Sequence, residues 1–386
     1  MGELQLTVYD TYIPIMPFIV RFIALSLLLT GTACGQSTDR LVAERSDWQT
    51  EWDRRSIDLS ELIPGGPPKD GIPSIDDPSF VSIQDARPWL EGKEPVISLA
   101  IEDEARAYPL QIMTYHEIAN HELADTPVVV SFCPLCYSAV VFSRDVGGEV
   151  LTFGVSGLLR HSDLVMFDRQ SESLWQQVTG EAIVGGYTGT TLDRIPAQII
   201  SFAQFAESYP DGLVLSRDTG YDRPYGRNPY AGYDDVGRRP FLYDGPTDER
   251  LPPMEKVVAV ESGESYKAYP HSVTRERRVI HDELDGRAIV VFHADGAVSA
   301  LDAAEIPSSR EIGSTGVFER SVGERTLHFD YDDGRFVDRE TGSRWTITGE
   351  ALDGPLRGQR LTPLDHGDYF SFAWFAFRPD TEIYTP

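Results

Sequence analysis

Two closely spaced cysteines are the residues of this sequence best suited to chemistry. Cys133 and Cys136 stand in the stretch "VVVSFCPLCYSAVVFSR" (128–144). Soft thiolates suit Cu(I) or Zn(II), whereas a close pair without metal tends to oxidise outside the cytoplasm. A disulfide closing so short a turn is strained and easily reduced. A metal site, a redox dithiol and a disulfide that only closes a turn therefore all remain open.

Apolar runs on both sides of the pair predict a strand, a tight hairpin turn and a second strand. The runs are Val128 to Phe132 and Tyr137 to Phe142, and Pro134 supplies the fixed φ that a turn favours. Thioredoxin-type dithiols instead stand at a helix N-terminus, where the helix dipole lowers the thiol pKa. A cysteine hairpin gives a tetrahedral metal only two ligands, so further ligands must come from elsewhere.

Three residues outside the turn are candidates for completing such a site. His116 lies in "YHEIANHE" (115–122), just before the cysteine strand. Glu117 beside it can orient the imidazole as a hydrogen-bond acceptor or act as a base. His161, in "GLLRHSDLV", is a further candidate ligand. A lone histidine is more often structural, which is the competing interpretation for both rings.

Similar blocks recur in the same order in two parts of the chain, about 94–217 and about 255–384. "MFDRQSESLW" (166–175) returns as "FVDRETGSRW" (336–345), and "TGEAIVGGYTGTTL" (179–192) returns as "TGEALDGPLRGQRL" (348–361). This order indicates an internal duplication of a unit of ordinary domain size. Two related domains, or two halves of one pseudo-symmetric fold, are the architectures that fit.

The duplication allows the two copies to be compared at the cysteine site. The alignment places Cys133 opposite His293, and His116 opposite Glu276. Other residues recur: Tyr108 as Tyr269, Pro109 as Pro270, His121 as His281, Asp168 as Asp338, Ser173 as Ser343, Trp175 as Trp345 and Gly180 as Gly349. The recurring residues therefore indicate the fold, whereas the cysteines and His116 are special to the first copy.

The periodicity of each copy predicts a β-rich α+β fold, with mostly antiparallel strands closed by one short helix. We expect the chain to be organised as an export signal at 1–34, a tether and lead-in at 35–86, a first repeat domain at 87–217, an interdomain strap at 218–254 and a second repeat domain at 255–386.

The strap is rich in tyrosine and arginine. A polar strap of this kind can line a ligand cleft between the two repeats and stack on a ring or a sugar. Packing of the same tyrosines on both domain cores fits the sequence equally well. The candidate ligand-contacting residues are Tyr221, Arg223, Tyr225, Arg227, Tyr230 and Tyr233.

The first 34 residues have the features of an export signal. After Met16, which this pattern favours over Met1 as the start, Arg21 precedes an apolar run that ends just before Cys34. The run is too short for a comfortable membrane span. Small residues before Cys34 resemble a lipoprotein signal, although Gly31 stands where that signal usually has Leu. We expect lipidation of Cys34 and anchoring at the extracytoplasmic face of a membrane, with a plain cleaved signal or an uncleaved anchor as the alternatives.

Charge and motifs exclude several classes of function. The chain has 34 Lys and Arg against 61 Asp and Glu, a formal charge of −27. Such a surface repels nucleic acid, so no nucleic-acid partner is expected. A Walker loop, a dinucleotide-binding GxGxxG and an HExxH zinc motif are missing. These absences argue against the corresponding enzymes, and no reaction is predicted.

The order and spacing of several motifs resemble the family known as domain of unknown function 3179, over about residues 87–386. The shared motifs are "HEI" (116–118), "CPLC" (133–136), "FGVSG" (153–157), "SDLVMFDRQ" (162–170), "LW" (174–175), "LSRDTGYDRPYGRNPYAGYDD" (215–235) and "RLPP" (250–253). The resemblance implies an exported protein and no known activity. Tyr137 stands where the family usually has Gly, and His161 where Asn is common. Replacement of the second cysteine by Thr in some relatives favours His116 with Cys133 over an obligatory disulfide.

Two functions follow from these observations. The first is an extracytoplasmic metal-binding or thiol-redox protein centred on Cys133, Cys136 and His116. The second is a non-enzymatic surface binding or assembly module that uses the cleft and the strap between the repeats.

Overall fold

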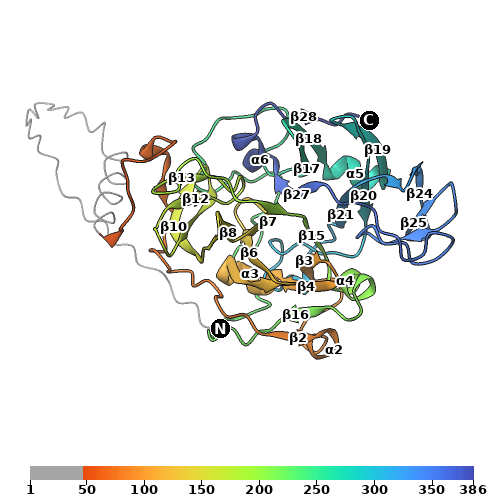
Figure 1. Ribbon diagram of the computed structural model, residues 1–386, viewed down its shortest axis with the longest axis horizontal. Helices are drawn as coiled ribbons and strands as arrows, with labels where there is room; N and C mark the ends of the chain where they lie inside the picture. The colour runs from red at the N-terminus through yellow and green to blue at the C-terminus, as the bar shows by residue number, and fades with distance from the viewer. Residues whose placement is uncertain (1–46) are drawn as a thin grey trace, which may run out of the picture.

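The computed structural model describes residues 47–386, so the predicted export signal and Cys34 lie outside the described residues. The fold is β-rich, which confirms the predicted class in its coarse form (Figure 1). Pairs of named strands are antiparallel except β16 with β4 and β18 with β28. Within residues 47–386, no helix is both long and apolar enough to cross a membrane.

The first half of the described chain builds three sheets and a short hairpin. The sheets, in strand order, are β1 (Ile63–Pro64), β10 (Phe153–Arg160), β11 (Asp163–Asp168), β12 (Leu174–Gln176) and β13 (Ala182–Val184); β14 (Arg194–Ile195), β7 (Ser138–Ser143), β6 (Thr126–Cys133) and β5 (Ile118–Leu123); β15 (Ala197–Ser201), β3 (Pro95–Ile101), β4 (Glu104–Pro109), β16 (Leu213–Leu215) and β2 (Phe80–Ser82); and the hairpin β8 (Asp145–Val146) with β9 (Glu149–Val150). The helices are η2 (Leu59–Glu61), α2 (Ile83–Ala86), α3 (Leu110–His116) and α4 (Phe202–Ser208).

The second half builds the remaining sheets. They are β27 (Asp365–Phe370), β17 (Lys256–Ser262), β18 (Ser265–Pro270) and β28 (Glu382–Ile383); β19 (Val279–Leu284), β20 (Arg287–Ala294) and β21 (Ser314–Glu319); β22 (Ser321–Val322) with β23 (Arg325–Thr326); and β24 (Phe329–Asp332), β25 (Arg335–Asp338) and β26 (Arg344–Trp345). The helices are α5 (His271–Arg277), η3 (Ile306–Ser308) and α6 (Ser371–Phe377).

One succession of elements occurs twice along the chain. The series β3–β4–α3–β5–β6–β7 has the same order and the same strand pairs as β17–β18–α5–β19–β20–β21. Both helices have seven residues and end on a residue with positive φ, Glu117 at 59° and Arg278 at 64°. The hydrogen bonds of the strands therefore show which residues correspond.

These bonds correct the sequence alignment by one position at the cysteine strand. The Phe132 N–H donates to the carbonyl of the residue after α3, and the His293 N–H donates to that of the residue after α5. His293 therefore corresponds to Phe132, whereas Cys133 corresponds to Ala294. The cysteine is still absent from the second series, as predicted. Its tight turn is replaced there by the longer loop 295–313 between β20 and β21.

A buried tyrosine contact gives the same one-residue correction. The Tyr108 hydroxyl lies 2.5 Å from His121 Nε2, and the Tyr269 hydroxyl donates to Asp282 Oδ2 at 2.8 Å. The structural counterpart of His121 is therefore Asp282, and the predicted match with His281 is wrong. Both series therefore have a polar partner for the tyrosine hydroxyl. The partner is an imidazole in the first series and a carboxylate in the second.

A tryptophan–aspartate pair has the same geometry in both halves. Trp175 Nε1 donates to Asp168 Oδ2 at 2.9 Å, and Trp345 Nε1 donates to Asp338 Oδ2 at 2.9 Å. All four side chains are fully buried. A buried carboxylate needs such donors because desolvation without them is costly. These residues therefore belong to the fold, as their recurrence in the sequence predicts.

The two halves share their hydrophobic cores. One core joins Ile97 and Phe142 of the first half to Val257 and Tyr369 of the second. Strands β7 and β27, one from each half, lie side by side near the centre of the molecule (Figure 1). The two halves therefore bury apolar surface against each other.

The described part of the predicted tether is folded onto the first half. Strand β1 pairs with β10, and β2 pairs with β16. Ile75 is buried in the main core, and Lys69 lies 2.6 Å from Glu172. Residues 47–86 are thus part of the fold, and they form one wall of the cavity described below.

We predict that Trp175→Phe lowers the free energy of unfolding by about 1–3 kcal/mol, because it leaves the buried Asp168 carboxylate without one donor. Trp345→Phe is expected to have a similar effect through Asp338. Denaturant unfolding measures both. The half-buried Trp89, whose indole N–H forms no hydrogen bond with a described residue, gives the matched control Trp89→Phe, which should cost less. Equal losses for all three variants would contradict the prediction.

Candidate functional site

The cysteine turn is a tight hairpin, as the sequence predicts. Strand β6 ends at Cys133, which pairs with Ser138 at the start of β7. Cys136 N donates to the Cys133 carbonyl at 3.2 Å, and Tyr137 reverses the chain at a φ of 54°. Both cysteines are free thiols and are buried, with 2% and 0% of their surfaces exposed. No helix begins at this turn, so no helix dipole acts on the thiols.

A second hairpin tip packs against the cysteine turn. His161 and Ser162 connect β10 to β11 with φ values of 52° and 69°, the positive pair that a two-residue hairpin loop requires. The Ser162 carbonyl faces both thiols, at 3.6 Å from Cys136 Sγ and 3.9 Å from Cys133 Sγ. The next residue, Asp163, begins β11 and is carried into the same buried space.

Asp163 and the two cysteines form a cluster of potential metal ligands. One carboxylate oxygen and the two sulfur atoms all lie within 4.8 Å of one another, and all three residues are buried. Asp163 Oδ2 accepts from Gln176 Nε2 at 2.6 Å and from the Val178 N–H at 3.1 Å. Oδ1 has no hydrogen-bond partner, and the Cys136 thiol lies close to the Asp163 carboxylate. The cluster thus contains one carboxylate oxygen and two sulfur atoms that are free to bind a metal.

Burial determines the protonation of this cluster. Desolvation raises the pKa of both thiols, well above the usual value for Cys136, and the nearby Asp163 charge raises them further. Desolvation also raises the pKa of Asp163 to about 6, against the hydrogen bonds that lower it. At neutral pH the thiols are therefore protonated and Asp163 is mostly ionised. Protonated, buried thiols are poor nucleophiles.

Sequence reasoning missed Asp163, although the residue lies in the motif "SDLVMFDRQ". Every residue of β11 is buried, and Asp163 is the first of them. An acidic residue directly before the apolar run Leu164 to Phe167 was the available signal, because a buried carboxylate needs a partner or a function.

His116 does not join the thiols. Its Nδ1 lies 2.7 Å from the Pro73 carbonyl, and its Nε2 lies 2.5 Å from the Tyr225 hydroxyl. Both ring nitrogens are thus occupied, and burial lowers the pKa of the imidazole. His116 ends α3 as Arg277 ends α5, so its counterpart is Arg277 and not Glu276. The histidine connects the lead-in to the strap.

Glu117 lies near the cluster but does not orient His116. Its backbone has the left-handed conformation at the C-terminal end of α3, and 7% of its surface is exposed. The carboxyl group forms no hydrogen bond with a described residue. Desolvation, with a contribution from the Asp163 charge, raises the pKa of Glu117 to about 8. A protonated carboxyl at neutral pH is the consequence.

His161 stands at the second hairpin tip but points to surface acids. Its Nε2 lies 3.5 Å from Glu61, and its Nδ1 lies 3.4 Å from Asp244. It is not part of the group formed by the cysteines and Asp163. His161 therefore forms part of the hairpin turn, whereas the Ser162 carbonyl contacts the two thiols.

The six strap candidates separate into two sets. Tyr230 and Tyr233 face a cavity of about 360 Å³ under the strap. The other four do not line it: Tyr221 and Tyr225 contact the His116 ring, Arg227 pairs with Glu305 at 3.4 Å, and Arg223 is exposed. The cavity lies between the strap, the lead-in and the first half. No residue of 255–386 lines it, so it is not a cleft between the repeats.

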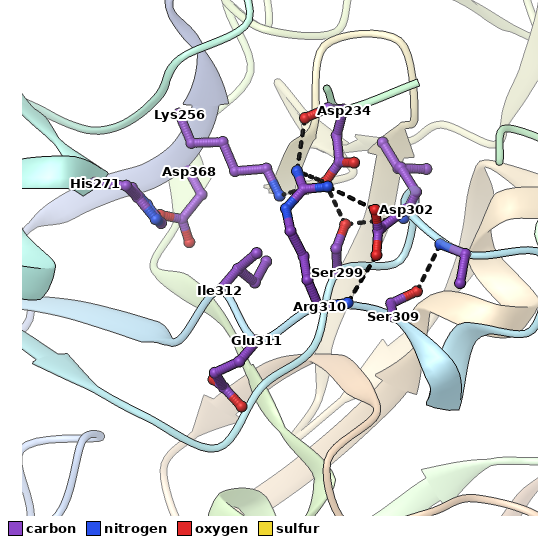
Figure 2. A network of polar contacts seen from close by, with 12 residues as sticks. Asp234, Lys256, His271, Ser299, Asp302, Ser309, Arg310, Glu311, Ile312 and Asp368 are labelled. Atoms are coloured by element: carbon purple, nitrogen blue, oxygen red, sulfur yellow. Dashed lines mark hydrogen bonds and ion pairs between the residues drawn. The ribbon is translucent and has the colours of Figure 1, made fainter. Parts of the chain in front are cut away.

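A charged network joins the loop 295–313 of the second half to Asp234 of the strap and to Lys256 of β17 (Figure 2). Arg310 bonds to the Asp234 carbonyl and to Asp302, each at 2.7 Å. Lys256 Nζ lies 3.4 Å from Asp234 and 3.5 Å from the centre of the Tyr137 ring. Desolvation lowers the pKa of Lys256 to about 8. The network therefore fixes Tyr137, the last residue of the turn, from the second half.

Comparison with known proteins identifies the family. The family model described as "Protein of unknown function (DUF3179)" matches residues 69–381. The chain therefore belongs to this family, which confirms the resemblance noted in its motifs and extends it into the lead-in. No curated protein and no solved structure is significantly similar to it.

We predict that both cysteines react far more slowly with Ellman's reagent in the folded protein than in urea, because they are buried and protonated. Asp163→Asn removes a negative charge that disfavours the thiolates, so it should lower the thiol pKa values. The thiolate absorbance at 240 nm, followed against pH, measures this shift. Exposed Asp145 gives the control Asp145→Asn. Equal titration curves for the two variants would contradict the prediction.

We predict that Glu117 makes the protein less stable as the pH rises. The carboxyl titrates near 4.5 in the unfolded chain and near 8 in the folded one, so the folded state holds the extra proton between these values. Its stabilising contribution is complete below about pH 4.5 and is lost through about pH 8.

Glu117→Gln should therefore raise the Tm at neutral and alkaline pH and flatten its pH dependence. Thermal unfolding from about pH 5 to about pH 8 measures the effect. Glu122→Gln, at an exposed position in the next strand, is the matched control. An unchanged pH profile in Glu117→Gln would show that this carboxyl is ionised in the fold.

Proposed function

We propose that this protein binds one zinc ion through Cys133, Cys136 and Asp163. The observation that carries the proposal is the buried cluster of two sulfur atoms and one carboxylate oxygen within 4.8 Å of one another. Two thiolates suit Zn(II) or Cu(I), and the carboxylate oxygen favours Zn(II) of the two. Asp163 replaces His116 as the third ligand.

The protonation of the cluster supports metal binding over thiol redox chemistry. A redox dithiol needs an accessible thiolate of lowered pKa, usually at a helix N-terminus. Here burial raises both thiol pKa values, and no helix starts at the turn. A dication can instead displace the thiol protons and balance the charge of the buried carboxylate.

The ligand count supports a site that accepts an outside ligand. Structural zinc sites have four protein ligands, whereas catalytic sites have three and leave one position for water or substrate. The cluster supplies three donors. Gln176 and the Val178 N–H hold Oδ2 of Asp163, which is the kind of support that fixes a ligand's orientation.

We further infer that the two matching series arose by duplication, and that the cysteine turn was kept or gained in the first alone. The shared strand registers and the two tryptophan–aspartate pairs support this inference. The leader, with its apolar run before Cys34, supports a lipid-anchored protein at the extracytoplasmic face of a membrane.

The test is metal titration of the purified protein after treatment with a chelator. We expect one Zn(II) per chain, and Co(II) should give a thiolate-to-metal charge-transfer band. Cys133→Ser should abolish that band, and Asp163→Asn should weaken binding by at least about 10-fold. Because His116 lies outside the cluster, His116→Ala should leave metal binding intact. Loss of binding in His116→Ala with retention in Asp163→Asn would overturn this ligand set.

The affinity should also depend steeply on pH. Both thiols are protonated before the metal binds, so two protons leave per ion. The apparent affinity is then expected to fall about 100-fold for each unit that the pH is lowered below the thiol pKa values. Competition with a chelating dye at several pH values measures this slope. A flat profile would mean that the thiols are not the ligands.

A further inference from the structure

The cavity under the strap lies directly beside the cysteine cluster. Its wall includes Leu135, which stands between the two cysteines, and Leu164, which follows Asp163. Ile72, Val155 and Phe241 make other parts of the wall apolar. A mainly apolar hollow of about 360 Å³ is large enough for a small organic molecule.

Two polar groups in the cavity that are not solvent-exposed lack protein partners. Among residues 47–386, the Glu117 carboxyl and the Tyr230 hydroxyl form no hydrogen bond or ion pair. Glu117 is more than nine-tenths buried, and its side chain lines the cavity. By contrast, the Tyr233 hydroxyl donates to the Leu135 carbonyl at 3.1 Å and accepts from the Phe241 N–H at 3.2 Å.

The two unpartnered groups line the same cavity, and an ionised Glu117 would influence Tyr230. After burial, the charge of Glu117 is the largest influence that raises the pKa of Tyr230, and Cys133 contributes as well. The carboxyl, the phenol and the cysteine cluster therefore lie in one region of the molecule. A single small molecule in the cavity can meet both polar groups.

We propose that this cavity binds a small, uncharged, mainly apolar molecule that carries one hydroxyl group, such as a phenol or a cyclic alcohol. A hydroxyl can donate to a Glu117 oxygen, whether the carboxyl is protonated or ionised, and can accept from the Tyr230 hydroxyl. The apolar walls bury the rest of the molecule. Arg238 is the single cation on the wall and is solvent-exposed, so a negative charge gains little there.

The test uses ¹⁹F NMR titration of the full chain with 4-fluorophenol and with 4-fluorotoluene, which has a methyl group in place of the hydroxyl. We expect 4-fluorophenol to bind about 10-fold more tightly, as one or two added hydrogen bonds allow. A third probe, 4-fluorobenzoate, should bind more weakly than the phenol. The proposal does not need the metal, so the preference should also appear in chelator-treated protein.

Variants locate the binding and identify its anchors. Tyr230→Phe and Glu117→Leu should each reduce the preference for the phenol toward 1-fold. Tyr221→Phe is the matched control, because the exposed Tyr221 hydroxyl lies outside the cavity and also lacks a hydrogen-bond partner among residues 47–386. Ala231→Trp, at an exposed position on the cavity wall, should obstruct the cavity and weaken binding of both neutral probes without disturbing the core.

Four results would overturn the proposal. Equal affinity for 4-fluorophenol and 4-fluorotoluene would mean that the cavity is only an apolar void. Tightest binding of 4-fluorobenzoate would assign the cavity to anions. Unchanged phenol binding in Ala231→Trp would mean that the phenol binds outside this cavity. No saturable binding of any probe would mean that the cavity is not a binding site for such molecules. Each result can be obtained whether or not zinc binds to the cysteine cluster.

Discussion

Desolvation of two thiols and a carboxyl group in one buried space is the constraint on which the rest of this structure depends. Two hairpin tips, at Cys133–Ser138 and at Arg160–Asp163, close over the three side chains. All three groups lose contact with water, which disfavours their charged forms and raises their pKa values. The zinc ion that we propose would resolve this conflict, because its charge would take the place of the protons and the solvent.

The second half of the chain supports the turn from outside. The Phe370 N–H donates to the Cys136 carbonyl at 2.9 Å, and Lys256 lies over the Tyr137 ring. Both contacts depend on the close packing of the two halves through β7 and β27. The loop 295–313, which occupies the place of the missing cysteine turn, carries Arg310 and so contributes to the same support. The second half, which has no cysteine turn of its own, thus helps to position the turn of the first half.

The sequence predicts what is local in this fold. The hairpin around Cys133, the β-rich class and the structural role of the recurring Asp168 and Trp175 follow from periodicity, turn residues and repetition. Asp163 could not be paired with the cysteines in this way, because two hairpins about thirty residues apart meet only through tertiary packing. The one-residue error at His293 has a related cause. Strand register is decided by hydrogen bonds across the sheet, and sequence similarity alone does not report it.

His116 shows the limit of arguing from residue type. A histidine near two cysteines suits a metal site, yet its two ring nitrogens are held by Pro73 and Tyr225. The strap that supplies Tyr225 also supplies Tyr230 to the cavity beside the cluster. Strap, lead-in and first half therefore meet in one region, in which the histidine holds the segments together and the cysteines and Asp163 are the metal ligands that we propose.

X-ray absorption spectroscopy at the zinc edge of the zinc-loaded protein tests the central claim most directly. Our account predicts a first coordination sphere with two sulfur atoms at about 2.3 Å and oxygen ligands at about 2.0–2.2 Å, without the outer-shell signal of an imidazole ring. It also predicts that Asp163→Asn changes the oxygen contribution and leaves both sulfur atoms in place. A sphere with no sulfur, or with a histidine ring beside the sulfur atoms, would contradict the site described here.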